Sequence, residues 1–463
     1  MPSRPGSADV LPLPLRAAIL LFVLLWLSYG AAIKTSDLKA YGLQQMGIDA
    51  LVEHGTLEVG KSTNPRLQPK GDVFRFEGRL FPAKQPGQFV IGAIAYTLVR
   101  WCGMSYDRDF LAAAAWVTWL SASSFAALSP TLLFVLFVRS WRLGQGPSLA
   151  AALVLGFGTP LFAYSGVAHQ DVISSAFLVA AFLALEEARQ SGSSLAWAAF
   201  GVACGLVLFV SMLPALMVMV LLAASLVSGS IRRIGLVGIG LLLGVLPLAL
   251  HNWAYFHSPL TQNYMAGGYT DSLFSPSWSR LRFTAWAYLG LGRISLWLYA
   301  PAAGAGFLFL VSSAVRDRWR RPSVGLLVVL VLMHLGYVLN ITAIGGCQFG
   351  PRYLMPCVIL MTAGCALQWD RAVQPGSSGV DRNLGLLLLV VSLASIAIGA
   401  VGARAGTMIC DLSVWVPARA LSGGLRPTRF PLALPMLTAL AAVAASALAV
   451  RWASRRKRQP PHA

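Results

Sequence analysis

Charged residues are scarce in this sequence: they make up only 11% of its 463 residues, whereas 57% are hydrophobic. A soluble globular protein carries about a quarter charged residues. The shortage excludes a soluble fold, because so much apolar surface can be hidden only in lipid. Acidic residues are scarcer than basic ones, 17 against 36, which gives a net charge of +19. Since no polar basic domain is available to bind nucleic acid, this charge indicates cytoplasmic anchoring and attraction to anionic lipid headgroups.

Cysteine patterns are also lacking. The six cysteines form no CxxC pair and show no metal-ligand spacing. Cys204, Cys357 and Cys365 fall inside expected membrane spans, so we predict no disulfide framework. A pairing of Cys347 with Cys410 on the outer face stays open.

What the sequence does contain is a series of long, uninterrupted apolar runs, which favour helices over a closed barrel. We predict an all-α, polytopic transmembrane helix bundle of about 11–13 spans. The run from Leu11 to Ile33 lacks a small-residue cleavage signal and is interpreted as a retained first helix. A shorter stretch at 88–102 is either a further span or a re-entrant segment. The expected spans are approximately 13–33, 110–138, 148–164, 170–187, 195–210, 212–229, 233–251, 294–314, 322–340, 353–369, 384–403 and 432–450.

The loops between these spans are unequal. Short, Arg-rich segments alternate with three long loops that are aromatic or Gly-rich, at 34–87, 252–293 and 404–431. Because basic loops stay in the cytoplasm, we predict an inner (cytoplasmic) membrane protein with both termini cytoplasmic. The long loops then face outward, and the first of them should contain juxtamembrane helices.

The first outer loop places Asp37, Tyr41 and Gln45 at i, i+4 and i+8, on one face of a helix that Ser36 could cap. Asp37 at a membrane boundary could accept a proton from an acceptor hydroxyl as a general base. It could equally do no more than complement the helix dipole. The spacing leaves both interpretations open.

Further along this loop, the runs on either side of Glu77 and Gly78 predict a small β-hairpin. Lys84 follows, just before the rigid Pro86-Gly87 corner. An interfacial lysine usually snorkels to the headgroups. One held by such a corner could instead pair with a lipid phosphate.

His169 and Asp171 lie at an outer turn between two expected spans. A lone His-x-Asp is weak as a metal site, because a metal needs three or more protein ligands. We therefore favour a capping or supporting role for the pair. Polar residues beside apolar spans still mark this turn as a candidate site.

Two arginines complete the outer clusters. Arg293 precedes a span in the aromatic second loop, and Arg352, followed by Tyr353, lies at the outer mouth of another span. Arg352 could pin a helix end to headgroups or clamp a phosphate in bidentate fashion, and we favour the clamp. A carboxylate, a lysine and arginines at one membrane surface suit a reaction on a phosphate-linked lipid, in which the cations stabilise the departing phosphate.

Several of these segments, in this order, resemble bacterial GT-C membrane glycosyltransferases, the relatives of protein O-mannosyltransferases and aminoarabinose transferases. The resemblance covers roughly residues 13–370. It rests on Asp-x-x-x-Tyr and Ala-Leu-Val-Glu-His-Gly-Thr-Leu in the first loop, then Phe-Pro-Ala-Lys-Gln-Pro-Gly, then Gly-Thr-Pro-Leu-Phe-Ala-Tyr-Ser, then a Gly-Arg…Leu-Tyr-Ala-Pro segment, then Gly-Pro-Arg-Tyr-Leu.

The resemblance implies an inverting transfer of a sugar from a polyprenyl-phosphate carrier to an acceptor outside the cytoplasmic membrane. Asp37 matches the base of that family, and Lys84 and Arg352 match basic positions that contact the carrier phosphate. This sequence departs from the pattern where Leu38 follows Asp37 in place of a second acid and where Ala83 and Gln85 replace the aromatic residue beside the lysine.

The expected organisation is a catalytic module over 1–370, with outer loops 34–87 and 252–293, followed by helices and a basic tail over 371–463. The site is predicted to consist of Asp37 as the catalytic residue, with Tyr41, Lys84, His169, Asp171, Arg293, Arg352 and Tyr353 binding substrate. No metal ligands and no certain cofactor are predicted, although a divalent metal remains possible. Expected partners are a polyprenyl-phosphate-linked sugar, a lipid, glycan or protein acceptor, and membrane lipids. A transporter or flippase of a lipid-linked sugar and a non-catalytic assembly protein are the alternatives.

Overall fold

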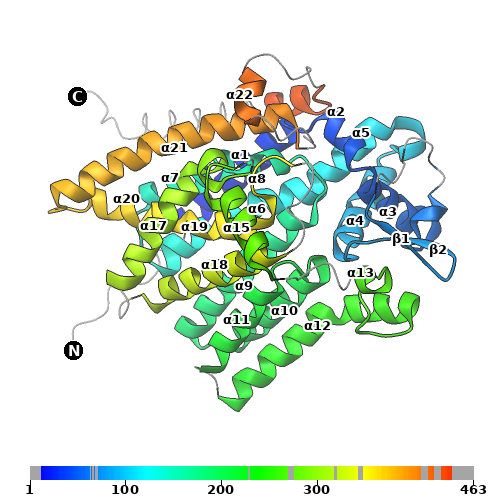
Figure 1. Ribbon diagram of the computed structural model, residues 1–463, viewed down its shortest axis with the longest axis horizontal. Helices are drawn as coiled ribbons and strands as arrows, with labels where there is room; N and C mark the ends of the chain where they lie inside the picture. The colour runs from blue at the N-terminus through cyan, green and yellow to red at the C-terminus, as the bar shows by residue number, and fades with distance from the viewer. Residues whose placement is uncertain are drawn as a thin grey trace, which may run out of the picture.

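The computed structural model describes residues 12–62, 64, 67, 71–227, 230–268, 276–292, 294–316, 321–341, 348–407, 415–421 and 429–440. Nearly all regular structure in these ranges is helical (Figure 1). The prediction of an all-α, polytopic membrane protein is therefore confirmed. Cys347, Cys410 and most of the last expected span lie outside the described residues.

The N-terminal part consists of a membrane helix followed by the small elements of residues 35–101. In order these are α1 (Pro12–Ala31), α2 (Thr35–Ala40), α3 (Gly42–His54), η1 (Val59–Lys61), β1 (Val73–Phe76), β2 (Arg79–Pro82) and α4 (Gly87–Trp101). A 35-residue apolar helix, Tyr106–Ser140, follows. It consists of α5 (Tyr106–Thr118), the π-helical turn η2 (Trp119–Ser123), α6 (Ser124–Val135) and the π-helical turn η3 (Leu136–Ser140).

The remaining elements form the body of the bundle and its last helices. They are α7 (Gln145–Phe157), α8 (Pro160–Tyr164), α9 (Gln170–Ser191), α10 (Ser194–Val210), α11 (Ala215–Val227), α12 (Ile231–Phe256), α13 (Asn263–Ala266), α15 (Trp278–Leu289), α16 (Leu296–Tyr299), α17 (Pro301–Arg316), α18 (Pro322–Asn340), η4 (Arg352–Leu354), α19 (Met355–Met361), α20 (Ala363–Val373), α21 (Gly379–Ala405) and α22 (Val416–Leu421). Residues 433–440 form one more helix.

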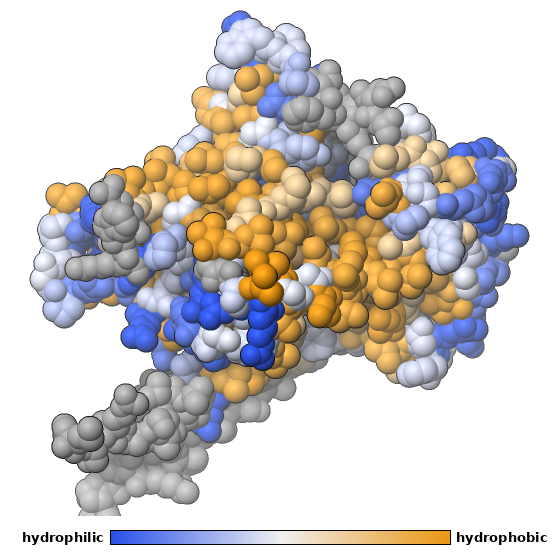
Figure 2. All heavy atoms as spheres, turned by 90° about the horizontal axis from the view of Figure 1, so that it is seen from below, coloured by the Kyte–Doolittle hydropathy of each residue, from blue (hydrophilic) through white to orange (hydrophobic). Residues whose placement is uncertain are grey.

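The apolar helices show the surface expected of membrane spans. Among the described residues, five helices are long and apolar enough to cross a bilayer, and four shorter apolar helices accompany them. The apolar windows of α12 and α21 are only 22% and 28% buried inside the protein, so lipid must cover the rest. Figure 2 shows the resulting apolar surface across the middle of the molecule, with hydrophilic side chains at its right end and in smaller groups toward the left.

Close helix packing in the bundle follows from small residues. Gly201 and Gly205 on α10 face Gly240 and Gly244 on α12, and both pairs have the Gly-xxx-Gly spacing. A Cβ on Gly201 would lie 2.2 Å from the carbonyl oxygen of Val237. Only glycine permits this approach, which gives the van der Waals contact that joins helices in lipid.

Two predicted spans are interrupted, which corrects the expectation of simple continuous helices. The run 148–164 divides into α7 and α8 at Thr159, whose hydroxyl caps α8 by accepting a hydrogen bond from the Leu161 amide. The run 353–369 divides into α19 and α20 at Thr362. There Gly364 lies so close to the Gly306 carbonyl of α17 that a Cβ would overlap it. Tight packing therefore sets this break, and hydropathy alone does not indicate it.

The small elements of residues 35–101 lie together at one end of the bundle, at the right in Figure 1. Here α4 accounts for the ambiguous stretch at 88–102 as a 15-residue helix that packs against α3 and α5. The predicted hairpin is present, with Val73 opposite Pro82 and Phe76 opposite Arg79. Its two-residue turn has positive φ at both Glu77 (51°) and Gly78 (77°), as a type I′ turn requires.

Candidate functional site

A cavity of about 170 Å³ opens between the loop after β2, the start of α9, the loop between α10 and α11, the end of α18 and the turn η4. Its walls come from segments far apart in the sequence, which only the bundle brings together. They include five residues predicted from the sequence: Lys84, His169, Asp171, Arg352 and Tyr353. The other walls are Ala83, Gln85, Gln170, Ser211, Met212, Leu213, Tyr337 and Ile341.

Arg352 is the principal cation of this cavity. Arg352 is only 8% exposed, and its Nε lies 3.5 Å from Oδ2 of Asp171. The guanidinium also lies over the Tyr353 ring, 5.2 Å from its centroid. Arginine suits such a place, because its delocalised charge is weakly hydrated and its planar donors match carboxylate and phosphate oxygens.

The turn that presents Arg352 is held by aromatic residues. The Tyr164 hydroxyl accepts a hydrogen bond of 3.1 Å from the Phe349 amide. Gly350 has a φ of +68°, and a Cβ there would lie 2.9 Å from the side chain of Tyr299. Both the backbone angle and the close approach require glycine. The Gly-Pro-Arg sequence therefore fixes where the arginine enters the cavity.

His169 is the N-cap of α9. Its Nδ1 accepts a hydrogen bond of 3.2 Å from the Asp171 amide, which satisfies one of the open donors of the helix end. Burial lowers the pKa of His169 well below its ordinary value, and Arg352 and Lys84 lower it further. The imidazole is therefore neutral, and its 3.3 Å approach to the Asp171 carboxylate is not an ion pair. The capping role favoured from the sequence agrees with this geometry.

Lys84 reaches the cavity from the loop after β2. Its Nζ lies 3.0 Å from Oδ2 of Asp72, whose side chain is 64% exposed, while Lys84 itself is 16% exposed. This pair lies at the water side of the cavity, so its Coulomb energy is small. Lys84 can therefore exchange Asp72 for another anion at little cost.

Asp37 lies in a second, buried cluster of side chains next to the cavity. The residue is 2% exposed, and its Oδ2 lies 3.2 Å from Nζ of Lys34, which is fully buried. Its Oδ1 accepts a hydrogen bond of 3.2 Å from the Thr407 amide, beyond the end of α21. Lys34 also donates a hydrogen bond of 2.7 Å to the Ala403 carbonyl. The carboxylate is thus held from two directions.

Tyr41 lies between the two clusters. Its hydroxyl is 3.2 Å from the Thr407 hydroxyl, and its ring meets the His169 ring edge-to-face at 5.8 Å. Burial raises the pKa of Tyr41 to about 12, although Arg352 opposes the shift. Tyr41 is therefore a neutral phenol in electrostatic reach of both Arg352 and Asp37.

The predicted single helix face of Asp37, Tyr41 and Gln45 is wrong. The backbone leaves the helical region at Tyr41 (φ −94°, ψ 39°), which ends α2 and begins α3. Gln45 instead accepts a hydrogen bond of 2.5 Å from the Tyr106 hydroxyl of α5. Ser36 lies inside α2, whose N-cap is Lys34, and so does not cap it.

Arg293 lies outside the described residues. In the ranges that the structure describes, no three His, Cys, Asp or Glu side chains gather as metal ligands would. His169 and Asp171 therefore have no third partner of this kind there.

The fold is similar to that of two kinds of solved protein. The structure of ArnT from Cupriavidus metallidurans bound to undecaprenyl phosphate has a TM-score of 0.52 and 14% identity, over 90% of this chain and 79% of that one. The apo oligosaccharyltransferase from Archaeoglobus fulgidus has a TM-score of 0.55 and 11% identity, over 86% of this chain. This chain covers 57% of the oligosaccharyltransferase's length. The sequence matches no family profile and no curated protein.

The chain has the GT-C fold. The resemblance found in the sequence is thus confirmed at the level of architecture. At identities this low, the likeness establishes the fold alone, so the chemistry must be argued from this chain's own residues.

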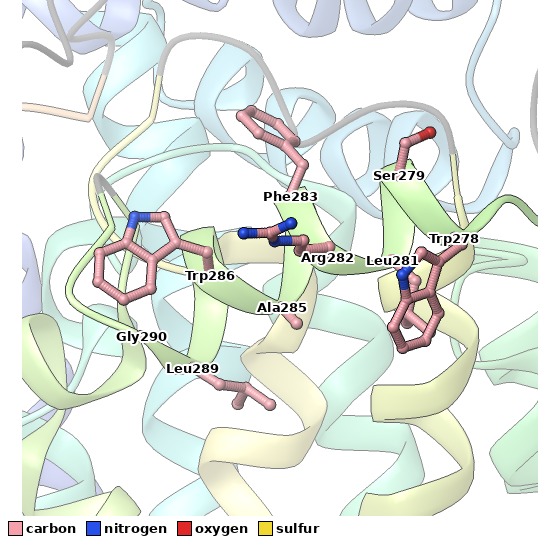
Figure 3. A pocket seen from close by; sticks show the side chains of 9 residues that line it. All are labelled: Trp278, Ser279, Leu281, Arg282, Phe283, Ala285, Trp286, Leu289 and Gly290. Atoms are coloured by element: carbon pink, nitrogen blue, oxygen red, sulfur yellow. The ribbon is translucent and has the colours of Figure 1, made fainter.

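A second, larger hollow shares no lining residue with the cavity around Arg352. It measures about 970 Å³ and follows the outer side of α15, where the labelled side chains include Trp278, Arg282, Phe283 and Trp286 (Figure 3). Trp278 and Trp286 are 79% and 61% exposed, as in the aromatic belts of membrane interfaces. None of the predicted site residues that the structure describes lines this hollow, so its size does not make it the candidate site.

Sequence reasoning missed three members of the two clusters. Lys34 was detectable, because it precedes Asp37 by one helical turn. Asp72 and Thr407 were not, because their partners Lys84 and Asp37 are reached only through the tertiary fold. Neither residue stands in a local motif that distinguishes it from an ordinary loop residue.

Proposed function

We propose that this chain is an inverting glycosyltransferase that moves a sugar from a polyprenyl-phosphate carrier to an acceptor hydroxyl or amine. The observation behind the proposal is that the cavity around the buried Arg352 lies next to the buried carboxylate of Asp37, with Tyr41 between them. The GT-C fold supports it, since one solved protein of this fold is bound to undecaprenyl phosphate.

The cavity supplies the groups that a departing phosphate needs. Arg352 offers a planar, desolvated cation, and Lys84 offers a point charge at the water side. Negative charge grows on the phosphate oxygen as the glycosidic bond breaks. Preorganised cations in a low-dielectric site stabilise that charge more strongly than water does.

Asp37 supplies the base. A carboxylate has about four lone-pair positions, and among the described residues the Thr407 amide and the Lys34 ammonium occupy two of those on Asp37. In the proposed step the acceptor oxygen or nitrogen attacks the anomeric carbon while Asp37 takes its proton. The carbon–oxygen bond to the phosphate breaks, polyprenyl phosphate leaves with the electron pair, and the anomeric configuration inverts.

We place this reaction at the outer face of the cytoplasmic membrane, with both termini in the cytoplasm. The supporting observation is that both clusters lie at the end of the bundle built from the long loops, in which basic residues are less dense along the sequence than in the short loops. Arg189, Arg316 and Arg371 mark the last turns of helices at short loops. The donor is then a membrane lipid, and the acceptor is a lipid, glycan or protein in the outer compartment.

The test is binding and turnover by purified protein in lipid nanodiscs. Undecaprenyl phosphate serves as the binding probe, and a panel of polyprenyl-phosphate hexoses and aminopentoses serves as donors. Wild type, Asp37→Asn and Arg352→Ala are compared, with release of polyprenyl phosphate as the readout. We expect wild type to bind and turn over, Asp37→Asn to bind without turnover, and Arg352→Ala to bind weakly.

Other results overturn the proposal in distinct ways. If wild type binds and moves the lipid-linked sugar between leaflets without cleaving it, the chain is a flippase. If none of the three proteins binds undecaprenyl phosphate, a non-catalytic assembly role takes its place.

A further inference from the structure

The buried cluster around Asp37 contains an unusual residue, Lys34, which lies at the junction of α1 and α2. Its side chain has no exposure to solvent, although it is a lysine at a membrane boundary where snorkelling to water would be easy. Burying an ammonium group is costly unless partners compensate for the lost hydration. Its partners here are Asp37 and the Ala403 carbonyl.

The end of α21 closes the cluster from the other side. Gly406 has a φ of +96°, and a Cβ on it would lie 3.2 Å from Oδ1 of Asp37. The next residue, Thr407, donates its amide to that same oxygen. Ala403, Gly406 and Thr407 therefore all meet the Lys34–Asp37 pair, and they lie beyond the boundary at 370 that the sequence suggested for the catalytic module.

Few other charges approach Asp37 from the packed elements that the structure describes. Apart from Lys34, Tyr41 is a titratable neighbour whose pKa is affected by both Asp37 and Arg352. The last turn of α21 bears Arg404, which is exposed. The first turn of α5, which packs against α2, bears Asp107 and Asp109. Lys34 is thus the cation in direct contact with the carboxylate.

We propose that Lys34, held by the C-terminal end of α21, is the positioning residue that holds the Asp37 carboxylate in place and balances its charge. This inference rests on the proposed function, since it assigns Lys34 to the same reaction. Lys34 does not touch substrate. It acts through Asp37, and α21 is then part of the catalytic unit.

The role follows from the chemistry of a buried base. A carboxylate taken out of water is protonated more readily unless a cation lies beside it, and a protonated Asp37 cannot accept the acceptor's proton. Without Lys34, the acidic limb of the pH–rate profile should move to higher pH by about 1–3 units. Measured below that limb, kcat should fall by roughly 10- to 1,000-fold, and KM for the donor should change little because the cavity is intact.

The experiment compares Lys34→Met, Lys34→Arg and wild type in nanodiscs, with pH–rate profiles and undecaprenyl phosphate binding measured on each. Lys39→Met is the matched control, because Lys39 lies on the same short helix but is exposed. We expect Lys34→Met to shift the limb, Lys34→Arg to restore most of it, and Lys39→Met to match wild type. A Lys34→Met protein with wild-type profile and full binding overturns the inference.

A second arm tests the contribution of α21. Gly406→Ala places a methyl group against the carboxylate and should lower kcat at unchanged binding. Gly376→Ala is its control, since Gly376 also has a left-handed φ of +81° but nothing within 4 Å of its Cβ position. Equal losses in both variants would mean that backbone strain alone is responsible, which contradicts a role at Asp37.

A third measurement needs no turnover. Infrared titration detects protonated carboxyl groups, and the band that disappears in Asp37→Asn belongs to Asp37. In Lys34→Met this band should persist to higher pH than in wild type. If no donor is turned over yet the band shifts, the proposed function fails while the ion-pair role of Lys34 stands. If the band does not shift, the inference about Lys34 fails whatever the activity.

Discussion

Asp37 and Asp171 are both nearly buried carboxylates beside a cation, yet their surroundings differ. Asp37 pairs with Lys34 within one helical turn, and both of its oxygens are contacted by the protein. Asp171 pairs at 3.5 Å with Arg352, which comes from a distant part of the chain, and both line a cavity. A local pair fixes one geometry of the carboxylate, whereas a pair on a cavity wall leaves room for an anion to bind beside the cation. The first arrangement suits a base and the second suits an anion site.

The most severe test of this difference is Asp37→Asn. The amide keeps the shape of the side chain but cannot accept a proton, so transfer should fall by about 10²–10⁴-fold, the usual worth of general base catalysis. Undecaprenyl phosphate binding should stay near the wild-type value, because the cavity is untouched. The measurement is kcat beside binding affinity, and a loss of both in equal measure would show that the two clusters are not separate.

Arg352→Ala should have the opposite profile. It leaves Asp171 buried without its cation, which costs about 3–5 kcal/mol in comparable buried pairs. Undecaprenyl phosphate binding should fall by at least about 30-fold, in line with the 2–5 kcal/mol seen for truncated buried charge pairs. Arg352→Lys is the informative partner, since it keeps the charge but loses the planar donors, and it should recover only part of the affinity. Full affinity in Arg352→Ala would remove the cavity from the proposed function.

The parts of this comparison that were predictable from the sequence are those that local pattern determines. Apolar runs predict the bundle, and the residues around Glu77-Gly78 predict the hairpin. The order of the polar motifs placed Lys84, His169, Asp171 and Arg352 in one outer site, and the structure puts them around one cavity. That outcome depended on topology: if the long loops share one face, their polar residues must also share it.

The rest depends on tertiary contacts that no local pattern contains. The backbone break at Tyr41 directs its hydroxyl to Thr407, although the i, i+4 spacing suggests a continuous helix. The cover over Asp37 comes from the end of α21, beyond the region of the family resemblance. Thr362 interrupts a span because α17 packs against it through Gly306, and hydropathy is blind to such contacts.

A smaller effect should follow when the turn that presents Arg352 is strained. Gly350→Ala must adopt a φ of +68° and overlap Tyr299, so we expect a loss of about 1–3 kcal/mol in stability. If the turn relaxes by moving Arg352, phosphate binding should weaken as well. Thermal unfolding and undecaprenyl phosphate binding measured together distinguish the two effects. Wild-type values in both would show that the turn does not fix the arginine.

His169 tests whether the cavity wall depends on a neutral imidazole. His169→Ala should cost about 0.5–2 kcal/mol through the lost cap, and His169→Asn should restore most of it. Since the folded pKa lies below the unfolded value, the unfolded state binds more protons at acidic pH. The stability from His169 is therefore present above about pH 6.5 and is lost as pH falls below it.

The check on His169 is thermal unfolding of wild type and His169→Asn from pH 7.5 to pH 4.5. The asparagine variant keeps a cap but cannot titrate, so the difference between the two proteins should change in its favour as pH falls. A constant difference across this range would mean that His169 does not titrate with unfolding, which would contradict a buried, neutral cap.

The smallest expected effect belongs to the pair at the water side, Lys84 and Asp72, and here the sign matters more than the size. Exposed ion pairs contribute about 0–1 kcal/mol, so Lys84→Met should weaken undecaprenyl phosphate binding by no more than about fivefold. Asp72 competes with the phosphate for the same ammonium group, at 3.0 Å. Asp72→Asn should therefore strengthen binding slightly, and both effects should shrink at high salt because exposed charges are screened. Weakening by both substitutions would mean that the Lys84–Asp72 pair serves to hold the hairpin loop in place, and that the cavity binds its anion through Arg352 alone.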